Sequence, residues 1–210
     1  QVENATEEIR KLNHEITYIS ASIAELKSKE TGQHLLRVSE FCYLLSKFLG
    51  NDEAECEKIK IAAVLHDIGK VGIPDEILNK PDKLDASEWS IMQNHSTLGY
   101  TMLCDSEFAS MRLAALIALE HHERWDGKGY PHGKAGTEIS LVGRICAIAD
   151  VFDSLLDKRV YKEPWEAEKV KEYFIQMSGE QFDPALCAIL LENYDMFIYT
   201  WKSLQHNRKS

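Results

Sequence analysis

Two adjacent histidines, His121 and His122, lie directly before a loop with three glycines and one proline in the segment HHERWDGKGYPHG. A helix that ends at Arg124 or Trp125 and runs into a turn accounts for the glycines. It does not account for two imidazoles, because one titratable ring already satisfies the helix dipole. Imidazole nitrogens bind transition metals, so the pair predicts a metal site if other parts of the chain supply further ligands.

Two further pairs have spacings that suit metal binding. His66 and Asp67 are adjacent in LHDIGK. A carboxylate beside an imidazole can bridge two metals through its two oxygens while the imidazole binds one. Glu30 and His34 are four residues apart in ETGQH, so a helix would present both on one face.

Two single residues complete this set, namely His95 in MQNH and Asp150 in AIAD. Any one histidine alone is more often a structural side chain than a ligand. Histidines scattered through apolar helices without a function would be costly to bury, which favours a shared site. Nitrogen and oxygen ligands without thiolate indicate iron, manganese, zinc or nickel rather than magnesium.

The segments that carry these residues have helical patterns. Apolar residues in HLLRVSEFCYLLSKFLG recur at helical spacing and stop at a glycine. Asp52 can cap a helix through IKIAAVLHDIGK, and Asp85 with Glu88 forms a capping box for DASEWSIMQNH. Further helices are predicted in MRLAALIALEHH, SLVGRICAIADVFDSLL, PWEAEKVKEYFIQM and PALCAILLENYDMF. No segment alternates as a strand does, so we expect an all-α bundle of about seven or more helices with a long loop between Trp125 and Ser140.

The first segment has the repeat of a coiled coil. Apolar residues alternate in steps of three and four at Val2, Ala5, Ile9, Leu12, Ile16, Ile19, Ile23 and Leu26. This pattern predicts a homodimer through a linker helix in residues 1–28, followed by a domain at 29–210. The chain begins without methionine, so we expect a fragment that lacks an N-terminal sensor or receiver domain. The alternative is a single amphipathic helix that packs on its own domain.

Composition narrows the class of protein. The chain has 210 residues, of which 44% are hydrophobic and 28% charged, as is usual for one globular domain. Its five cysteines contain no CxxC pair, which indicates neither a thiolate zinc site nor a disulfide framework and predicts reduced thiols in the cytoplasm. The net charge of −10 argues against general nucleic-acid binding. No apolar run reaches the roughly 20 residues of a membrane span.

Several motifs together resemble those of the HD-GYP family, cyclic dinucleotide phosphodiesterases within the HD metal-phosphohydrolase superfamily. They are HDIGK, IPDEILNKPDKL, HHERWDGKGYP and AIADVFDSLLDKRVYK, in the order in which the family has them. The resemblance implies an all-helical HD core with a di- or trinuclear centre that usually contains iron or manganese. It also implies hydrolysis of cyclic di-GMP to the linear dinucleotide pGpG, or onward to GMP.

The same resemblance implies roles for individual residues. The metal ligands would be Glu30, His34, His66, Asp67, His95, His121, His122 and Asp150, with Asp67 as the bridge. Lys70 would contact the phosphate that is cleaved, as a catalytic and substrate-binding residue. Further substrate contacts are implied for Gly129, Tyr130 and Pro131 of the GYP lip and for Asp153, Arg159 and Lys162. For the charged residues, Lys162 above all, a solvated helix face is the alternative. Many family members have RPYK where this chain has RVYK at 159–162.

Three functions fit these observations. The first is hydrolysis of cyclic di-GMP, and the second is the same reaction on 3′,3′-cyclic GMP-AMP, because the ligands fix the reaction but not the base. The third is a catalytically silent receptor or partner-binding module, for example toward diguanylate cyclases through the GYP loop. Family members with a glutamate before TGxH resemble the trinuclear type, so Glu30 predicts a third metal.

Overall fold

The computed structural model describes residues 2–28, 32–157 and 164–206, and the regular structure within these ranges is helical. It forms ten α-helices and two 3₁₀ helices, η1 and η2, and these described ranges contain no strand. In chain order the elements are α1 Val2–Lys27, α2 Gln33–Phe48, α3 Glu53–Ala63, η1 Ile68–Gly72, α4 Asp75–Leu78, α5 Ala86–Leu103, α6 Ala109–Glu120, η2 Gly136–Glu138, α7 Leu141–Leu156, α8 Ala167–Met177, α9 Pro184–Glu192 and α10 Tyr194–His206. The predicted all-α bundle is confirmed.

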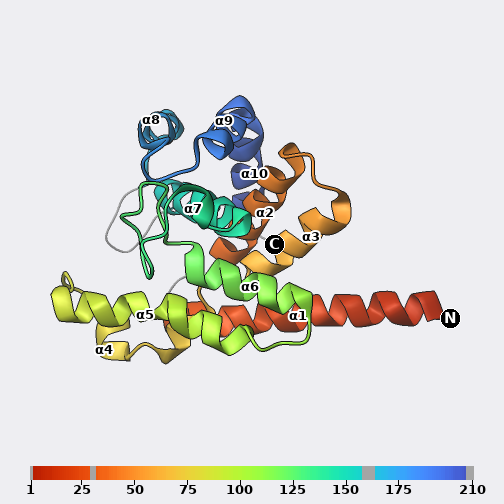
Figure 1. Cartoon of the computed structure of the whole chain (residues 1–210). Helices are drawn as coiled ribbons and strands as arrows, with labels where there is room; N and C mark the ends of the chain where they lie inside the picture. Colours follow the sequence, from red (N-terminus) through yellow and green to blue (C-terminus); the bar gives the residue numbers. More distant parts are fainter. Residues whose placement is uncertain (1, 29–31, 158–163, 207–210) are drawn as a thin grey trace.

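The core lies between α2, α3, α6 and α7, and α8 to α10 pack on α2 and α7 (Figure 1). The central helix is α7, whose sequence is apolar on nearly every face and whose residues are mostly buried. Phe152 of α7 packs edge to face against Phe41 at 4.9 Å and against Phe197 at 5.8 Å. This packing fixes the face of α7 that carries Asp150 and Asp153.

The start of α5 follows the predicted capping box. The Asp85 carboxylate accepts hydrogen bonds from the backbone N–H groups of Ser87 and Glu88, and the Glu88 carboxylate accepts one from Asp85 N. The two carboxylates thus accept from backbone N–H groups that have no hydrogen-bond partner within the helix. The cap therefore sets where α5 begins, and with it the position of His95 two turns from the end of the helix.

One predicted helix is shorter than its apolar run suggests. Asp52 caps α3 as expected, accepting a hydrogen bond from Glu55 N at 2.8 Å. However, α3 ends at Ala63, and His66 and Asp67 lie in the turn that follows. In this turn the backbone hydrogen bonds join residues three apart instead of four, for example His66 N to Ala63 O at 3.2 Å.

The long helix α1 is attached to the domain by its C-terminal end only. Its N-terminal part extends beyond the other helices (Figure 1). The side chains of Ala21 and Ala24 are buried against the domain, and the last turns of α1 contact η1. Six apolar side chains of the predicted repeat are more than half exposed, namely Ile9, Leu12, Ile16, Ile19, Ile23 and Leu26. In the single chain this stripe, here called the α1 stripe, does not pack on its own domain.

Two further observations concern membrane-spanning helices and the cysteines. None of the described helices combines the length and the apolar character that a membrane crossing requires. All five cysteines are free thiols, and four of them are buried in the helical core.

Candidate metal centre

The turn between α3 and η1 carries Asp67, and the candidate ligands gather around this residue. Lys70 N donates to the Asp67 carbonyl at 2.9 Å, which closes the first turn of η1. Gly69 allows η1 to touch α5, because a Cβ at this position would lie 1.9 Å from the His95 carbonyl oxygen. Only glycine, which has no Cβ, allows a backbone contact this close. The approach of η1 to α5 places Asp67 beside His95.

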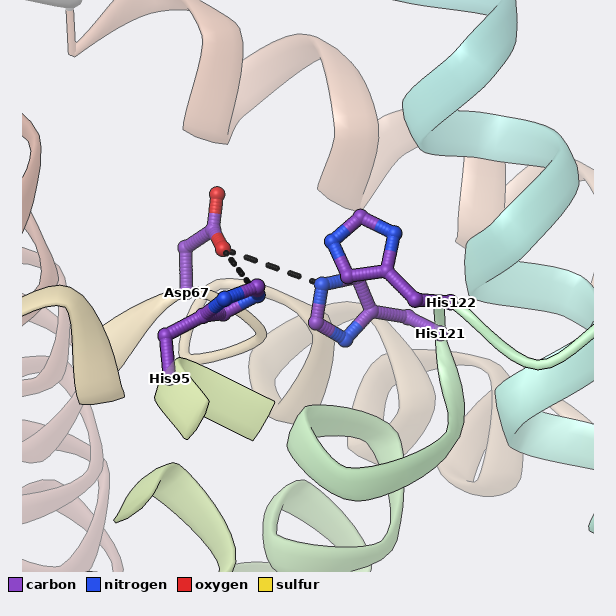
Figure 2. Close-up of side chains that lie close together, drawn as sticks. All are labelled: Asp67, His95, His121 and His122. Carbon is purple, nitrogen blue, oxygen red and sulfur yellow. Dashed lines mark ion pairs between the residues drawn. The ribbon is translucent and has the colours of Figure 1, made fainter. Parts of the chain in front are cut away.

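Figure 2 shows a first group of four converging side chains, Asp67, His95, His121 and His122. Asp67 Oδ1 lies 3.3 Å from His95 Nε2 and 3.7 Å from His121 Nε2. His121 is the C-cap of α6 and His122 follows in the turn, so α6 ends before the pair rather than after it as the sequence pattern suggested. One ligand atom from each residue lies within 4.8 Å of the other three, which suits a single metal ion.

A second group consists of His34 on α2, His66 and Asp150 on α7. His34 Nε2 is 3.4 Å from Asp150 Oδ1, and His66 Nε2 is 3.3 Å from Asp67 Oδ2. Asp67 therefore faces the first group with Oδ1 and the second group with Oδ2. This is the arrangement expected of a carboxylate that bridges two metals.

Four of the rings are oriented through their Nδ1 atoms. The acceptors are Asp153 Oδ2 for His34 at 2.7 Å, Ala63 O for His66 at 2.9 Å, Met92 O for His95 at 2.8 Å, and the carbonyls of Ile117 and Ala118 for His121 at 3.0 Å. Carbonyl and carboxylate oxygens accept here, so Nδ1 of each ring donates its proton outward and Nε2 is the nitrogen left on the side of the centre. These hydrogen bonds orient the rings so that the Nε2 atoms face the centre as the possible metal ligands.

The residues fit a bound transition metal. Four buried ligand atoms make no hydrogen bond to any described residue: Nε2 of His34, His66 and His121, and Oδ1 of Asp67. Buried polar atoms are rarely left without a partner, and these four point into one region from several elements. A set of imidazoles and carboxylates without thiolate suits iron, manganese or zinc.

Burial controls the charge of the imidazoles. It lowers the pKa of His95 to about 4, and together with the neighbouring His121 and His95 it holds the pKa of His122 well below its usual value. Both rings are therefore neutral near pH 7, as metal ligands must be. Burial alone would also lower the pKa of His66, but the Asp67 carboxylate raises it to about 10. A metal bound by His66 must displace that proton.

Asp153, for which a substrate contact was predicted, lies in a buried hydrogen-bond network behind His34. Its side chain is fully buried, and Oδ1 accepts from Arg37 Nε at 2.5 Å while Oδ2 accepts from His34 Nδ1 and Arg37 Nη2. Burial alone would raise the pKa of this carboxyl, but the bonds from His34 and Arg37 hold it below its usual value. Arg37 is itself fully buried and also pairs with Asp157. Asp153 therefore orients His34.

The GYP lip lies beside the first group. Tyr130 stacks on His122 with ring centres 4.7 Å apart, and its backbone N–H donates to the His122 carbonyl at 3.2 Å. Gly129 permits this approach, since a Cβ there would lie 2.4 Å from Arg124 N. Pro131 follows Tyr130 where the loop turns back.

Two buried glutamates hold the loop in place, although the sequence did not single them out. The Glu123 carboxylate accepts from the backbone N–H groups of His132 and Lys134 at 2.8 and 3.1 Å. The Glu120 carboxylate accepts from Ser140 N at 2.7 Å and from Lys134 Nζ. In the sequence these two glutamates stand directly before and directly after the histidine pair.

Lys70 lies beside Asp67. Its Nζ is 2.6 Å from Asp67 Oδ2, and its side chain is 14% exposed. A cavity of about 300 Å³ opens beside His121 and His122 and is also lined by Trp89 and Gln93 of α5. Sequence reasoning missed both residues; the available signal was a tryptophan, Trp89, among polar residues in ASEWSIMQNH, and its side chain is half exposed in the structure. Glu30, Arg159 and Lys162 lie outside the described residues.

Comparison with known proteins agrees with this geometry. A protein-family profile described as "HD domain" matches residues 19–186. The chain is 46% identical over 201 residues to 3′3′-cGAMP-specific phosphodiesterase 2 of Vibrio cholerae, covering 96% of this chain and 38% of that protein. It is 43% identical over 171 residues to a cyclic di-GMP phosphodiesterase response regulator of Xanthomonas campestris, covering 81% of this chain and 45% of that protein.

The fold also matches a solved structure. The crystal structure of a cyclic GMP-AMP specific phosphodiesterase of V. cholerae aligns with a TM-score of 0.65 and 18% identity, covering 89% of this chain and 50% of that chain. At this identity the match supports the fold alone. The chain spans less than half the length of the two curated relatives described above.

Proposed function

Because this chain belongs to the HD-GYP family of HD-domain proteins, we propose that it is a metal-dependent hydrolase that cleaves a phosphodiester bond of a cyclic dinucleotide. One observation supports this proposal more strongly than the others. The two ligand groups meet at Asp67, which faces each group with a different oxygen. That arrangement is typical of centres that hold two metals close together for phosphoryl chemistry.

The chain's own residues have distinct tasks in this proposal. Divalent ions, for which we propose iron or manganese with zinc or nickel as alternatives, supply Lewis acidity and activate water at neutral pH. Asp67 and the imidazoles hold the ions, and Lys70 offers its ammonium to an oxygen of the phosphate. Tyr130 and Trp89, with ring centres 6.0 Å apart, form the aromatic wall against which a base can stack. The cavity is small enough that it takes one part of the dinucleotide.

The preferred base is a separate question from the reaction. Cyclic di-GMP, hydrolysed to pGpG and onward to GMP, is the first candidate. The similarity to a 3′3′-cGAMP-specific enzyme favours 3′,3′-cyclic GMP-AMP as the second. The complete ligand groups argue against a silent binding module, because such a module has no need for Nε2 atoms kept open in a buried site. Binding of diguanylate cyclases by the GYP loop stays a prediction.

Hydrolysis by anaerobically purified protein tests this proposal. The protein, with its metals counted, is incubated with cyclic di-GMP and with 3′,3′-cyclic GMP-AMP side by side, and linear products are followed by chromatography. We expect linear dinucleotide from at least one substrate, and we expect a chelator to stop its formation. Protein that contains at least two ions per chain and converts neither substrate would contradict the proposal.

We further propose that two copies of the chain pair in parallel through the α1 stripe. The stripe keeps its three-four spacing over the described side chains from Ile9 to Leu26, and all six members are exposed in the single chain. An exposed apolar row of this length on an extended helix is unfavourable in water unless a second helix covers it.

Replacing Ile16 and Ile23 by glutamate should convert the dimer to a monomer, because like charges would face each other in the seam. Sedimentation equilibrium measures the change. The control places the same charges on α1 outside the stripe with His14→Glu and Thr17→Glu, which should leave the dimer intact. A wild-type chain that is monomeric at high concentration would show that the pairing proposal is wrong.

A further inference from the structure

The last turns of α1 carry a buried carboxylate beside the metal centre. Glu25 is 1% exposed, although Ile23 and Leu26 on the same helix are exposed to solvent. One carboxylate oxygen of Glu25, one ring nitrogen of His34 and one carboxylate oxygen of Asp67 lie within 4.8 Å of one another. This third group lies on the side of the centre that faces α1.

Hydrogen bonds fix the end of α1 on the segment that follows Asp67. Lys27 Nζ donates to the carbonyl oxygens of Val71 at 2.8 Å and Ile73 at 2.5 Å. In return, Asn79 Nδ2 donates to the Lys27 carbonyl at 3.0 Å. The end of α1 is therefore tied to η1, which begins directly after Asp67.

A second contact ties α1 to the start of α2. The Tyr18 hydroxyl donates to the Gly32 carbonyl at 2.5 Å, two residues before His34. Glu25 lies along α1 between Tyr18 and Lys27, so the two ties hold its carboxylate in place relative to both His34 and Asp67.

The charges around Glu25 favour a cation at this position. Glu25 is 1% exposed and Asp67 is 7% exposed, and one carboxylate oxygen of each lies within 4.8 Å of the other. The Nε2 atom of His34 is buried and makes no hydrogen bond to a described residue. Two carboxylate oxygens and one imidazole nitrogen this close together form a ligand set for a divalent transition-metal ion, which would also give the nitrogen a partner.

We propose that Glu25 is a metal ligand, which together with His34 and Asp67 binds a divalent transition-metal ion in addition to the ion held by Asp67 and the three histidines of the first group. The proposal rests on the proposed metal-dependent function, but it makes α1 a part of the centre. It also offers a source for a third metal other than Glu30.

The third group has a consequence for how α1 acts. A ring nitrogen binds one ion, so His34 Nε2 serves either this group or the group with His66 and Asp150. When a metal occupies the Glu25 group, His34 belongs to that group. The ion of the second group would then be bound by His66 and Asp150 together with Asp67. Rotation or axial shift of α1 would withdraw the Glu25 carboxylate, so occupancy of this site depends on the position of α1.

Metal titration of the whole chain tests the proposal. Metal-free wild type, Glu25→Gln and Glu30→Gln are titrated with Mn²⁺ without oxygen, and bound ions are counted by elemental analysis after dialysis. Glu15→Gln is the matched control, because Glu15 is exposed on the same helix. We expect Glu25→Gln to weaken the weakest Mn²⁺ site at least about tenfold, as losing a ligand does. Glu15→Gln should titrate as the wild type.

Thermal unfolding supplies a second readout that does not depend on activity. Without metal, Glu25→Gln should melt at the same temperature as the wild type or higher, because the substitution removes a buried charge. Added Mn²⁺ should raise its melting temperature less than that of the wild type. Should the amide variant not fold, Glu25→Ala is titrated against the same criterion.

The outcomes separate this proposal from the proposed function. If the weakest site of Glu25→Gln binds Mn²⁺ as tightly as in the wild type, the assignment of Glu25 is overturned. The tighter sites, and with them the proposed function, are not affected by that result. Loss of the weak site in Glu30→Gln alone also overturns it and assigns the ligand to Glu30. A wild type that binds no Mn²⁺ at any site overturns the proposed function and this proposal together.

Discussion

Asp67→Asn is expected to reduce turnover of the preferred cyclic dinucleotide by at least about a thousandfold, or ~4 kcal/mol in the barrier. Asp67 belongs to the first and third ligand groups, and its Oδ2 faces His66 of the second. The amide keeps the shape of the side chain but removes the charge and one of two metal-binding oxygens. Turnover and bound metal are measured on the same anaerobic preparation, and both should fall.

The matched control for this experiment is Asp82→Asn. Asp82 is exposed in the segment before α5, so the same chemical change there should leave turnover and metal content as in the wild type. A residual turnover of more than a few per cent in Asp67→Asn, within ~2 kcal/mol of the original barrier, would show that Asp67 does not join two metals.

Arg37→Met should lower the free energy of unfolding by about 3 to 5 kcal/mol, the typical cost of breaking a buried ion pair from one side. Arg37 and Asp153 are both fully buried, and the guanidinium donates two hydrogen bonds to the carboxylate. Methionine fills much of the volume but leaves the Asp153 charge with only the His34 ring for compensation. Urea unfolding of the metal-free chain measures the change.

A second substitution separates the charge from the loss of packing. Adding Asp153→Asn to Arg37→Met removes the uncompensated carboxylate and should recover part of the lost stability. Arg112→Met is the control, since Arg112 is exposed and donates to the nearby backbone carbonyls of Ser106 and Glu107. If Arg37→Met unfolds at the same urea concentration as Arg112→Met, the buried pair does not stabilise the domain.

Local chemistry made the helices predictable from the sequence, but their ends were predictable only where a cap marks them. Asp52 and Asp85 start α3 and α5 as expected, because an N-cap satisfies donors within three residues. The end of α3 was not predictable, since the apolar run continues through residues 64 and 65, which are buried whether or not the backbone is helical. The break is set by contacts of η1 with α5, far away in sequence.

The ligand types of the site were predictable, whereas the partners that position them were not. Histidines stand out among apolar helices, and the structure brings His34, His66, His95 and His121 together. Arg37, the buried partner of Asp153, lies 116 residues away, so no local pattern could predict this ion pair. Glu25 lay in a segment predicted to be a linker, and only the docking of α1 on η1 shows that its carboxylate faces the centre.

Anomalous X-ray scattering from crystals of the anaerobically prepared chain tests the bridged metal centre most directly. Data collected on both sides of the iron and manganese edges locate each ion and identify it. We predict at least two peaks, one among His95, His121 and His122 and one near His66, with a different oxygen of Asp67 facing each. Active protein with one peak or none at Asp67 would contradict the two-metal centre on which the proposed hydrolysis depends.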